Sequence, residues 1–285
     1  MTDISCRGAQ PALEAAKVLD VAGIAHVCVG WLAVALLAFD ANLGEVELVV
    51  RDKDFAAARA SLVQGGFRLC EDAQCRELCD RRPPPLESQE QLFSLNECQD
   101  FFAPNASHLI ASAHFHLGAQ YSQCTVLSLY KKSEILRWIP VLEDDPGKDD
   151  PSLIWLSNDA PRLPPARPDG PCGPWRHAQA VRLLSPAAFC ELLLFLYCRD
   201  CSHVGLRQFS CRAMFERCAG HQMRLDRRLR PDFQEVWESM VDFFAHKIGP
   251  RDPFPALHAL RMRLIAAEEI LYEEMPQVDE DAIRY

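Results

Sequence analysis

The sequence predicts an α/β (α+β) protein with a helical C-terminal region. Over roughly the first seventy residues, short apolar runs alternate with amphipathic segments, which is the pattern of strands alternating with helices. From residue 185 onward, apolar residues recur at helical spacing or fill whole segments. We therefore divide the chain into an α/β domain at 1–142, a connecting segment at 143–184 and a helical region at 185–285.

The stretch 27–52 is the part around which the rest of the chain is organised. A strand is expected at about 25–29, and its apolar run, 27–29, ends at Gly30, where the backbone can turn sharply or approach a ligand closely. The following segment, 31–39, is apolar on all sides, which predicts a buried helix. The pattern is a strand, a glycine corner and a short helix.

Two carboxylates come next in the chain. Val46–Val50 predicts a second strand, and Glu45 and Glu47 flank its first residue. Because strand side chains alternate, both carboxylates point to one face. Such a pair near a glycine corner can bind a divalent metal ion or act as acid and base, or it can be the solvated face of an edge strand.

The remaining elements of the first domain follow from the same rules. Glycines close the helices expected at 11–22 and 55–62, and Ser133 is expected to cap a short helix at 134–138. Further strands are expected at 67–70, 109–117 and 124–130. The polar, proline-containing stretch 75–91 predicts a loop or insertion.

The second half begins with the irregular segment 143–184, which is first acidic and then rich in proline. This composition predicts a solvated linker, although its large apolar residues Trp155, Leu156 and Trp175 favour the alternative of a strap lying over the pocket. Ser185 followed by Pro186 predicts the start of a central apolar helix. Further helices are expected at 206–218, 231–247 and 255–274, before an acidic tail at 275–285.

Charge and hydropathy argue against two classes of partner. The formal net charge is −10, whereas nucleic-acid binders usually carry a basic face, so we expect no nucleic-acid partner. A local cluster of arginines at 224, 227, 228 and 230 is the exception. The longest apolar run, 27–39, is shorter than the ~20 residues that span a bilayer, and no signal peptide is visible. We expect a cytoplasmic protein without a membrane partner.

Cysteine usage supports the same compartment. There are 13 cysteines, an odd number, scattered through expected strands and helices, so all are expected to be reduced. The spacing Cys198-x-x-Cys201 with His203, followed by Cys211, Cys218 and His221, resembles a zinc site only weakly, because the second cysteine pair is six residues apart and no glycine or aromatic knuckle frames it.

Two further pairs of residues are candidates for chemistry. His114 and His116 share a strand face, and they can bind a transition metal or serve as acid and base if their strand neighbours Glu45 and Glu47. The alternative is two partly exposed histidines in a half-buried strand. Lys131 and Lys132 follow the next strand and can bind an anionic ligand, although two lysines there are more often solvated.

The stretch 27–52 resembles the nucleotidyltransferase-like superfamily. Gly30 matches the first glycine of the family's strand–glycine–helix corner, and Glu45 and Glu47 fall where the family carries its acidic pair, about fifteen residues later. The segments AHFHL, LYKKSEIL and RLPP are similar to divergent fungal members. The resemblance covers roughly the first half of the chain and implies a mixed sheet with flanking helices.

The chain also departs from the family pattern in ways that bear on activity. Family enzymes need a small residue after the first glycine, where this chain has Trp31. They hold two metal ions with an aspartate pair and a third carboxylate, whereas this chain has glutamates and no acidic residue at 124–130. These departures predict that the standard chemistry is lost.

Three functions stay open on the sequence. The first is a repurposed small-molecule pocket, a pseudoenzyme-like site that catalyses at most a metal-free step in fungal specialised metabolism. This reading requires no cofactor and places catalytic roles on Glu45, Glu47, His114 and His116, with Gly30, Trp31, Lys131 and Lys132 binding ligand. The second is an active nucleotidyltransferase with Mg²⁺ on Glu45 and Glu47. The third is a non-catalytic interaction protein.

Overall fold

The computed structural model of the protein describes residues 9–39, 45–72, 75, 111–121, 126–139, 142, 148–175, 179–200, 206–244 and 253–271. Several sequence-based expectations lie outside these residues. Of the loop expected at 75–91, only Cys75 is described. Cys201 and His203 of the weak zinc pattern and the acidic tail expected at 275–285 also lie outside the described residues.

The first half contains α1 (Ala9–Val21), β1 (His26–Val29), α2 (Gly30–Leu37), β2 (Val46–Val50), η1 (Asp52–Asp54), α3 (Phe55–Gln64), β3 (Arg68–Leu69), β4 (Ala113–His116), η4 (Ala119–Tyr121), β5 (Val126–Lys131) and α5 (Lys132–Ile135). The second half contains β6 (Ile154–Leu156), β7 (Arg182–Leu184), α6 (Pro186–Asp200), α7 (Leu206–Gly220), α8 (Pro231–Phe244) and α9 (Pro253–Ala266). The α/β class predicted from the sequence is confirmed.

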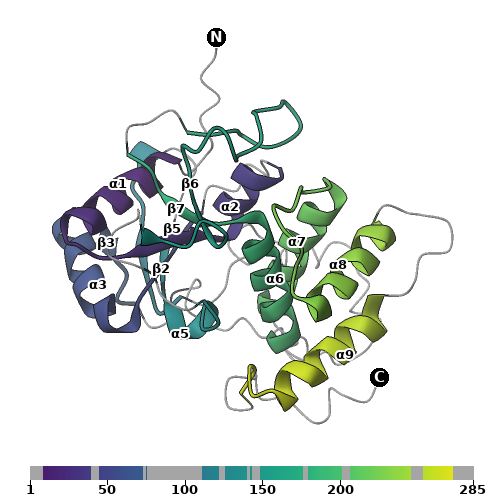
Figure 1. The fold of residues 1–285 in the computed structure, drawn as a ribbon. Helices are drawn as coiled ribbons and strands as arrows, with labels where there is room; N and C mark the ends of the chain where they lie inside the picture. The colour runs from purple at the N-terminus through teal and green to yellow at the C-terminus, as the bar shows by residue number, and fades with distance from the viewer. Residues whose placement is uncertain are drawn as a thin grey trace, which may run out of the picture.

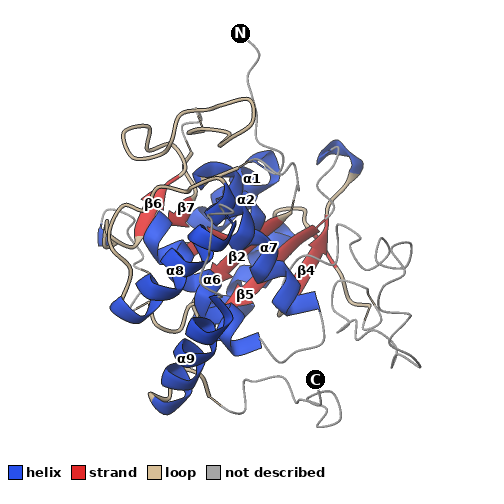
Figure 2. Ribbon diagram, turned by 90° about the vertical axis from the view of Figure 1, so that its right-hand side faces the viewer, coloured by secondary structure: helices blue, strands red, loops and turns tan. Residues whose placement is uncertain are grey.

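All the described strands form one mixed sheet of seven strands in the order β3-β4-β5-β2-β1-β7-β6. The pairs β2–β5 and β1–β7 are parallel, and the other neighbours are antiparallel. Figure 2 shows β6 and β7 at one end of the sheet and β4 toward the other. The antiparallel β1–β2 pair therefore lies inside the sheet and is covered on both edges.

Helices lie on both sides of the sheet. In Figure 1, α1 and α3 lie together on the left, and α6 to α9 lie on the right. Helix α2 contacts α7, so the first half of the chain packs directly against the second. One cluster of buried apolar residues runs from Ala9 to Ile270 and includes side chains of the sheet and of the C-terminal helices. The described parts of the two halves thus share a single hydrophobic core.

The segment 143–184, which the sequence predicts as a linker or strap, contributes two strands to the sheet. Strand β7 pairs in parallel with β1, and β6 pairs with β7. Trp155 and Trp175 are both buried, as the strap interpretation requires. Each strand has only three residues, which is too short for an alternating pattern to stand out among prolines.

The expected cap of the short helix after β5 is also displaced. Helix α5 begins at Lys132, with Lys131 as the N-cap residue, so Ser133 lies inside the helix. The Glu134 side chain accepts the backbone N–H of Lys131 at 3.1 Å and closes the first turn. The backbone N–H of Ser133 instead donates to Asp52 at 3.0 Å, which ties α5 to the end of β2. The expectation of a Ser133 cap was wrong by two residues.

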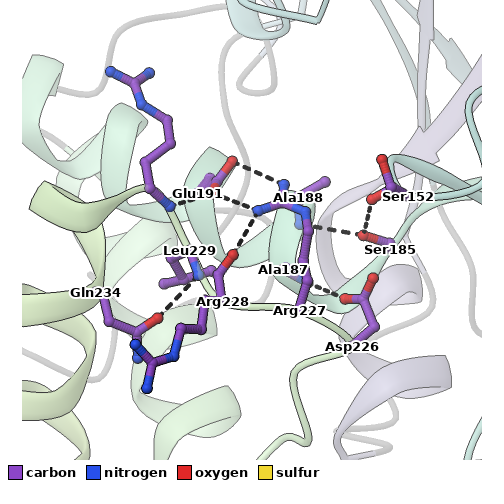
Figure 3. A network of polar contacts seen from close by, with 11 residues as sticks. Ser152, Ser185, Ala187, Ala188, Glu191, Asp226, Arg227, Arg228, Leu229 and Gln234 are labelled. Atoms are coloured by element: carbon purple, nitrogen blue, oxygen red, sulfur yellow. Dashed lines mark hydrogen bonds and ion pairs between the residues drawn. The ribbon is translucent and has the colours of Figure 1, made fainter.

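Polar contacts fix the start of α6 and the loop between α7 and α8 (Figure 3). The Ser185 hydroxyl accepts the backbone N–H of Ala188 at 3.4 Å, which confirms the predicted cap. Glu191 accepts two hydrogen bonds from the Arg227 guanidinium, at 2.9 and 3.2 Å. Arg230 donates two to Glu269, both at 2.7 Å. Two arginines of the expected basic cluster are therefore neutralised by carboxylates.

None of the described helices combines the length and the apolar composition that a membrane-crossing helix needs.

His26, in β1, is a buried titratable group in the centre of the sheet. Its side chain is almost fully buried, and Nδ1–H donates to the Ile24 carbonyl at 3.1 Å. Burial lowers the pKa of His26, and the charge of Arg182 adds to this, whereas the Ile24 carbonyl and Asp20 oppose it. The folded state therefore favours the neutral ring.

We expect this histidine to make the protein less stable in mild acid. Below the unfolded pKa of about 6.5, the unfolded chain binds a proton that the folded chain binds only at lower pH, so the free energy of unfolding falls as pH falls. His26→Asn keeps an N–H donor toward Ile24 but cannot titrate, so its free energy of unfolding should depend less on pH. Urea denaturation between about pH 7.5 and 5.5 measures the difference. His258→Asn, on the exposed face of α9, is the control and should keep the wild-type slope. Identical slopes for His26→Asn and wild type would contradict the assignment.

Candidate functional site

The glycine corner joins β1 to α2. Gly30 has φ +68°, a left-handed conformation that favours glycine, and it is the first residue of α2. Residues on β1 and β2 pair so that Val29 lies opposite Glu47. A Cβ atom on Gly30 would lie 1.3 Å from Oε2 of Glu47. The absence of a side chain at Gly30 is therefore what allows the Glu47 carboxylate to lie against the corner.

Glu47 is held by groups of the protein itself. Its side chain is almost completely buried, Oε2 accepts the backbone N–H of Trp31 at 3.2 Å, and Oε1 accepts the hydroxyl of Tyr130 at 3.2 Å. Burial and the Glu47 charge raise the pKa of Tyr130, so the phenol stays protonated and remains a donor. Burial and the same charge also raise the pKa of the Cys28 thiol. Glu47 thus behaves as the anion bound at the start of α2.

Glu45 lies beside this arrangement. It immediately precedes β2 and is 7% exposed, so it is more accessible than Glu47 at 1%. Its charge contributes to the raised pKa of Tyr130, which places Glu45 near the same phenol. The predicted placement of Glu45 and Glu47 beside the Gly30 corner agrees with the structure. The corner therefore carries two carboxylates, of which Glu47 is the more deeply buried.

Strand β5 runs beside β2 and supplies the position where a third carboxylate is expected. Ser128 is in register with Glu47, and Tyr130 follows two residues later on the same face. The strand reads VLSLYK and contains no carboxylate. The side chains that β5 presents beside Glu47 are therefore neutral.

His114 and His116 lie on β4, which is separated from β2 by β5. His114 is in register with Ser128 and shares a face with Glu47, but one strand stands between them. The expectation that the histidines and glutamates converge required neighbouring strands, and that condition is not met. A row of polar side chains instead crosses three strands, from Glu47 through Ser128 to His114.

The histidines meet two cysteines. Cys75 Sγ lies 3.2 Å from Nε2 of His114 and 3.7 Å from Nε2 of His116. Cys70 completes a group whose four ligand atoms all lie within 4.8 Å of one another. The histidine pair was found from the sequence, but its partners were not. The signal was Cys70-x₄-Cys75 at the end of an expected strand, which was overlooked in favour of the pattern around Cys198.

The lysines expected to bind ligand are far along the sheet from the corner. Lys131 pairs in register with Val50, at the end of β2 opposite to Glu45. The ammonium of Lys131 lies 3.9 Å from Glu134, and burial lowers the pKa of Lys132. Neither lysine shares the region around Gly30, so the structure does not assemble them with the two glutamates.

The described cysteines are all free thiols: Cys28, Cys70, Cys75, Cys172, Cys190, Cys198, Cys211 and Cys218. Burial raises the pKa of Cys218 to about 12 and that of Cys190 as well, so these two thiols stay protonated. Among the residues that the structure describes, they belong to no group with metal-binding geometry, whereas Cys70 and Cys75 do. The two features with chemical potential are the Gly30 corner and the cysteine–histidine group.

The geometry of the corner is that of a closed acidic junction, in which a strand, a helix start and a buried carboxylate stabilise one another. Both carboxylate oxygens of Glu47 already accept hydrogen bonds, one from the Trp31 N–H and one from the Tyr130 hydroxyl. Comparisons of the chain with family models, with curated proteins and with solved structures found no match.

Proposed function

We propose that this protein is a divergent member of the nucleotidyltransferase-like superfamily whose corner site no longer transfers nucleotides and takes a small molecule without phosphate groups. The proposal is supported by the order of strand, glycine corner, short helix and acid-bearing strand in 26–50. It is also supported by the mixed sheet in which β1 and β2 are antiparallel and β2 and β5 are parallel.

One observation carries the proposal: the Glu47 carboxylate occupies the start of α2. A helix N-terminus attracts anions because its backbone N–H groups point outward and its dipole is positive there. Here the Trp31 N–H, one of these donors, is used by Glu47 at 3.2 Å. A nucleotide phosphate would have to displace this buried carboxylate, which carries the same sign of charge. The space beside the Gly30 Cα is also filled, because the Glu47 carboxylate lies where a Cβ of Gly30 would be.

The same geometry disfavours two-metal catalysis. A pair of metal ions needs carboxylates whose oxygens are available to bridge both ions. Both oxygens of Glu47 accept hydrogen bonds from the protein, and the residue beside it on β5 is Ser128. A missing carboxylate removes a ligand that holds the transferring phosphoryl group in line, and little else stabilises that transition state. We therefore propose that the site functions without Mg²⁺.

The charge of the corner defines the class of ligand. Glu45 and Glu47 contribute negative charge to the corner, and Lys131 lies at the other end of β2, in register with Val50. A neutral or cationic molecule is favoured over a phosphate ester in such a field. The more accessible Glu45 is the group that would bind an ammonium or hydroxyl of this ligand.

We expect no metal-dependent nucleotide binding by the full-length protein. Isothermal titration with ATP, CTP, GTP and UTP, each with Mg²⁺ or Mn²⁺, should give dissociation constants weaker than about 1 mM. Glu45→Gln and Glu47→Gln should behave like wild type in this experiment. Micromolar binding that needs the metal and is lost in both variants would show that the alternative, an active nucleotidyltransferase, is right.

The ligand itself can be sought in the same preparation. Small molecules released by denaturing the purified protein are identified by mass spectrometry and compared with those released from Glu45→Gln. We expect a phosphate-free compound that is depleted in Glu45→Gln and retained in Glu235→Gln, which changes an exposed glutamate of α8. Recovery of a nucleotide, or equal recovery from all three proteins, would contradict the proposed ligand class.

A further inference from the structure

Four side chains at the edge of the sheet have the composition of a zinc site. Strands β3 and β4 are antiparallel, with Arg68 opposite His116, and the backbone N–H of Cys70 donates to the His114 carbonyl at 3.0 Å. Cys70 therefore lies opposite His114. His116 is two residues after His114 on β4, so the two histidines share one face of the strand. The backbone N–H of Cys75 donates to the Asp72 carbonyl at 3.0 Å, and the Cys75 side chain lies at the same place.

The distances from Cys75 to the two histidines are close to those of tetrahedral coordination. Zinc–sulfur bonds near 2.3 Å and zinc–nitrogen bonds near 2.0–2.1 Å place neighbouring ligand atoms about 3.3–3.8 Å apart in a tetrahedron. The Cys75 sulfur lies 3.2 and 3.7 Å from the two Nε2 atoms, and all four ligand atoms lie within 4.8 Å of one another. The imidazole planes of His114 and His116 are 83° apart, so the rings do not stack. Their Nε2 atoms both lie within 3.7 Å of the Cys75 sulfur.

We propose that Cys70, Cys75, His114 and His116 bind one Zn²⁺ ion in a closed structural site. Two thiolates and two imidazoles are the ligands that zinc prefers over Mg²⁺ or Ca²⁺, which take oxygen ligands. Four protein ligands leave no open position for substrate, which is the mark of a structural site. This site is independent of the function proposed for the corner.

Two other readings of the group account for less of it. A cysteine–histidine nucleophile pair needs only Cys75 and His114. It does not explain why Cys70 and His116 lie at the same place. A Cys70–Cys75 disulfide uses neither histidine, and reduced thiols are what the structure contains. Zinc binding accounts for all four side chains at once.

The metal would strengthen the weakest edge of the sheet. Strand β3 is at the end of the strand order and has only two residues, so few ladder hydrogen bonds hold it. A zinc ion joins the residue directly after β3 to two residues of β4 and fixes Cys75 against them. Because such a site forms only in the folded chain, zinc binding adds to folding stability.

Zinc analysis of the full-length protein, purified without chelators, tests the assignment. We expect about one zinc ion per chain by elemental mass spectrometry. Cys75→Ser and His116→Ala should each weaken zinc binding at least about 100-fold in competition with a chromogenic chelator, since loss of a ligand exceeds the effect of losing an outer-shell partner. Cys172→Ser removes a cysteine of similar burial outside the group and should bind zinc like wild type.

Cobalt substitution gives a readout that does not depend on activity. The Co²⁺ protein should show the visible absorption of tetrahedral cobalt and a thiolate charge-transfer band, and Cys70→Ser should weaken that band. Circular dichroism of His116→Ala, whose altered residue is only half-buried, shows whether the fold is kept. The proposal is overturned if wild type binds zinc no more tightly than Cys75→Ser, if zinc content is unchanged in both ligand variants, or if Cys70 and Cys75 form a disulfide in the isolated protein.

Discussion

Gly30→Ala is expected to destabilise the protein by about 4 kcal/mol, because a left-handed alanine costs about 1 kcal/mol and displacement of Glu47 breaks two buried hydrogen bonds at about 1–3 kcal/mol each. The added Cβ would lie 1.3 Å from Oε2 and 2.2 Å from Cδ of Glu47, so the carboxylate must move. Moving it breaks its hydrogen bonds with the Trp31 N–H and the Tyr130 hydroxyl. Urea denaturation followed by circular dichroism measures the free energy of unfolding.

Gly23→Ala is the matched control for backbone strain. Gly23 has the same φ, +68°, but a Cβ there would meet no atom within 4 Å. Its substitution should cost only about 1 kcal/mol. The difference between the two variants isolates the contact with Glu47.

A double-mutant cycle tests whether that contact is the cause. Glu47→Ala removes the carboxylate that the new Cβ would strike, so Gly30→Ala should cost markedly less in this background than in wild type. Equal costs of Gly30→Ala in both backgrounds, or equal effects of Gly23→Ala and Gly30→Ala, would mean that Glu47 does not depend on the glycine. The corner would then lose the feature on which the proposed function is based.

The corner could be predicted from the sequence because its signals are local. An apolar run ending at Gly30, an apolar helix and the alternation around Val46 are all contained within twenty-five or so residues, and each is a consequence of backbone geometry. The bounds of β2 were predicted as they occur, Val46–Val50. Helix α6 likewise follows from the Ser185 and Pro186 pair at its start.

The partners of the candidate residues could not be predicted, because they depend on strand order. His114 and His116 were expected beside the glutamates, but β5 lies between β4 and β2. Nothing in a single strand's pattern indicates which strand will pair with it, since the same alternation fits any neighbour. Cys75 stands outside any regular element, so periodicity carried no information about where it would lie.

The connecting segment departs from the predicted linker, and agrees better with the alternative of a packed segment, for a different reason. Its acidic and proline-rich composition is typical of solvated chain, but two three-residue strands suffice to join it to the sheet. A buried ion pair adds a second tie: Arg182 on β7 and Asp149 before β6 are 3.0 Å apart, and both side chains are 4% exposed. Composition does not indicate which residues of such a segment pack against the rest of the protein.

Asp149→Asn is therefore expected to destabilise the whole protein by about 3–5 kcal/mol, because it removes one charge of a buried ion pair while the Arg182 guanidinium stays in a low-dielectric site. The loss should extend beyond 148–184, since β7 pairs with β1 at the centre of the sheet. Circular dichroism and tryptophan fluorescence should report the same lowered urea midpoint.

Asp159→Asn is the matched control in the same segment. Asp159 pairs with Arg162 at 3.4 Å, but the side chains are 23% and 45% exposed, and such a pair contributes about 0.5 kcal/mol. Asp149→Leu combined with Arg182→Met removes both buried charges and should recover most of the stability lost in Asp149→Asn, because two apolar side chains of similar size need no counter-charge. A midpoint for Asp149→Asn as high as that for Asp159→Asn would show that 143–184 is attached as a linker after all, and that the sheet is complete without β6 and β7.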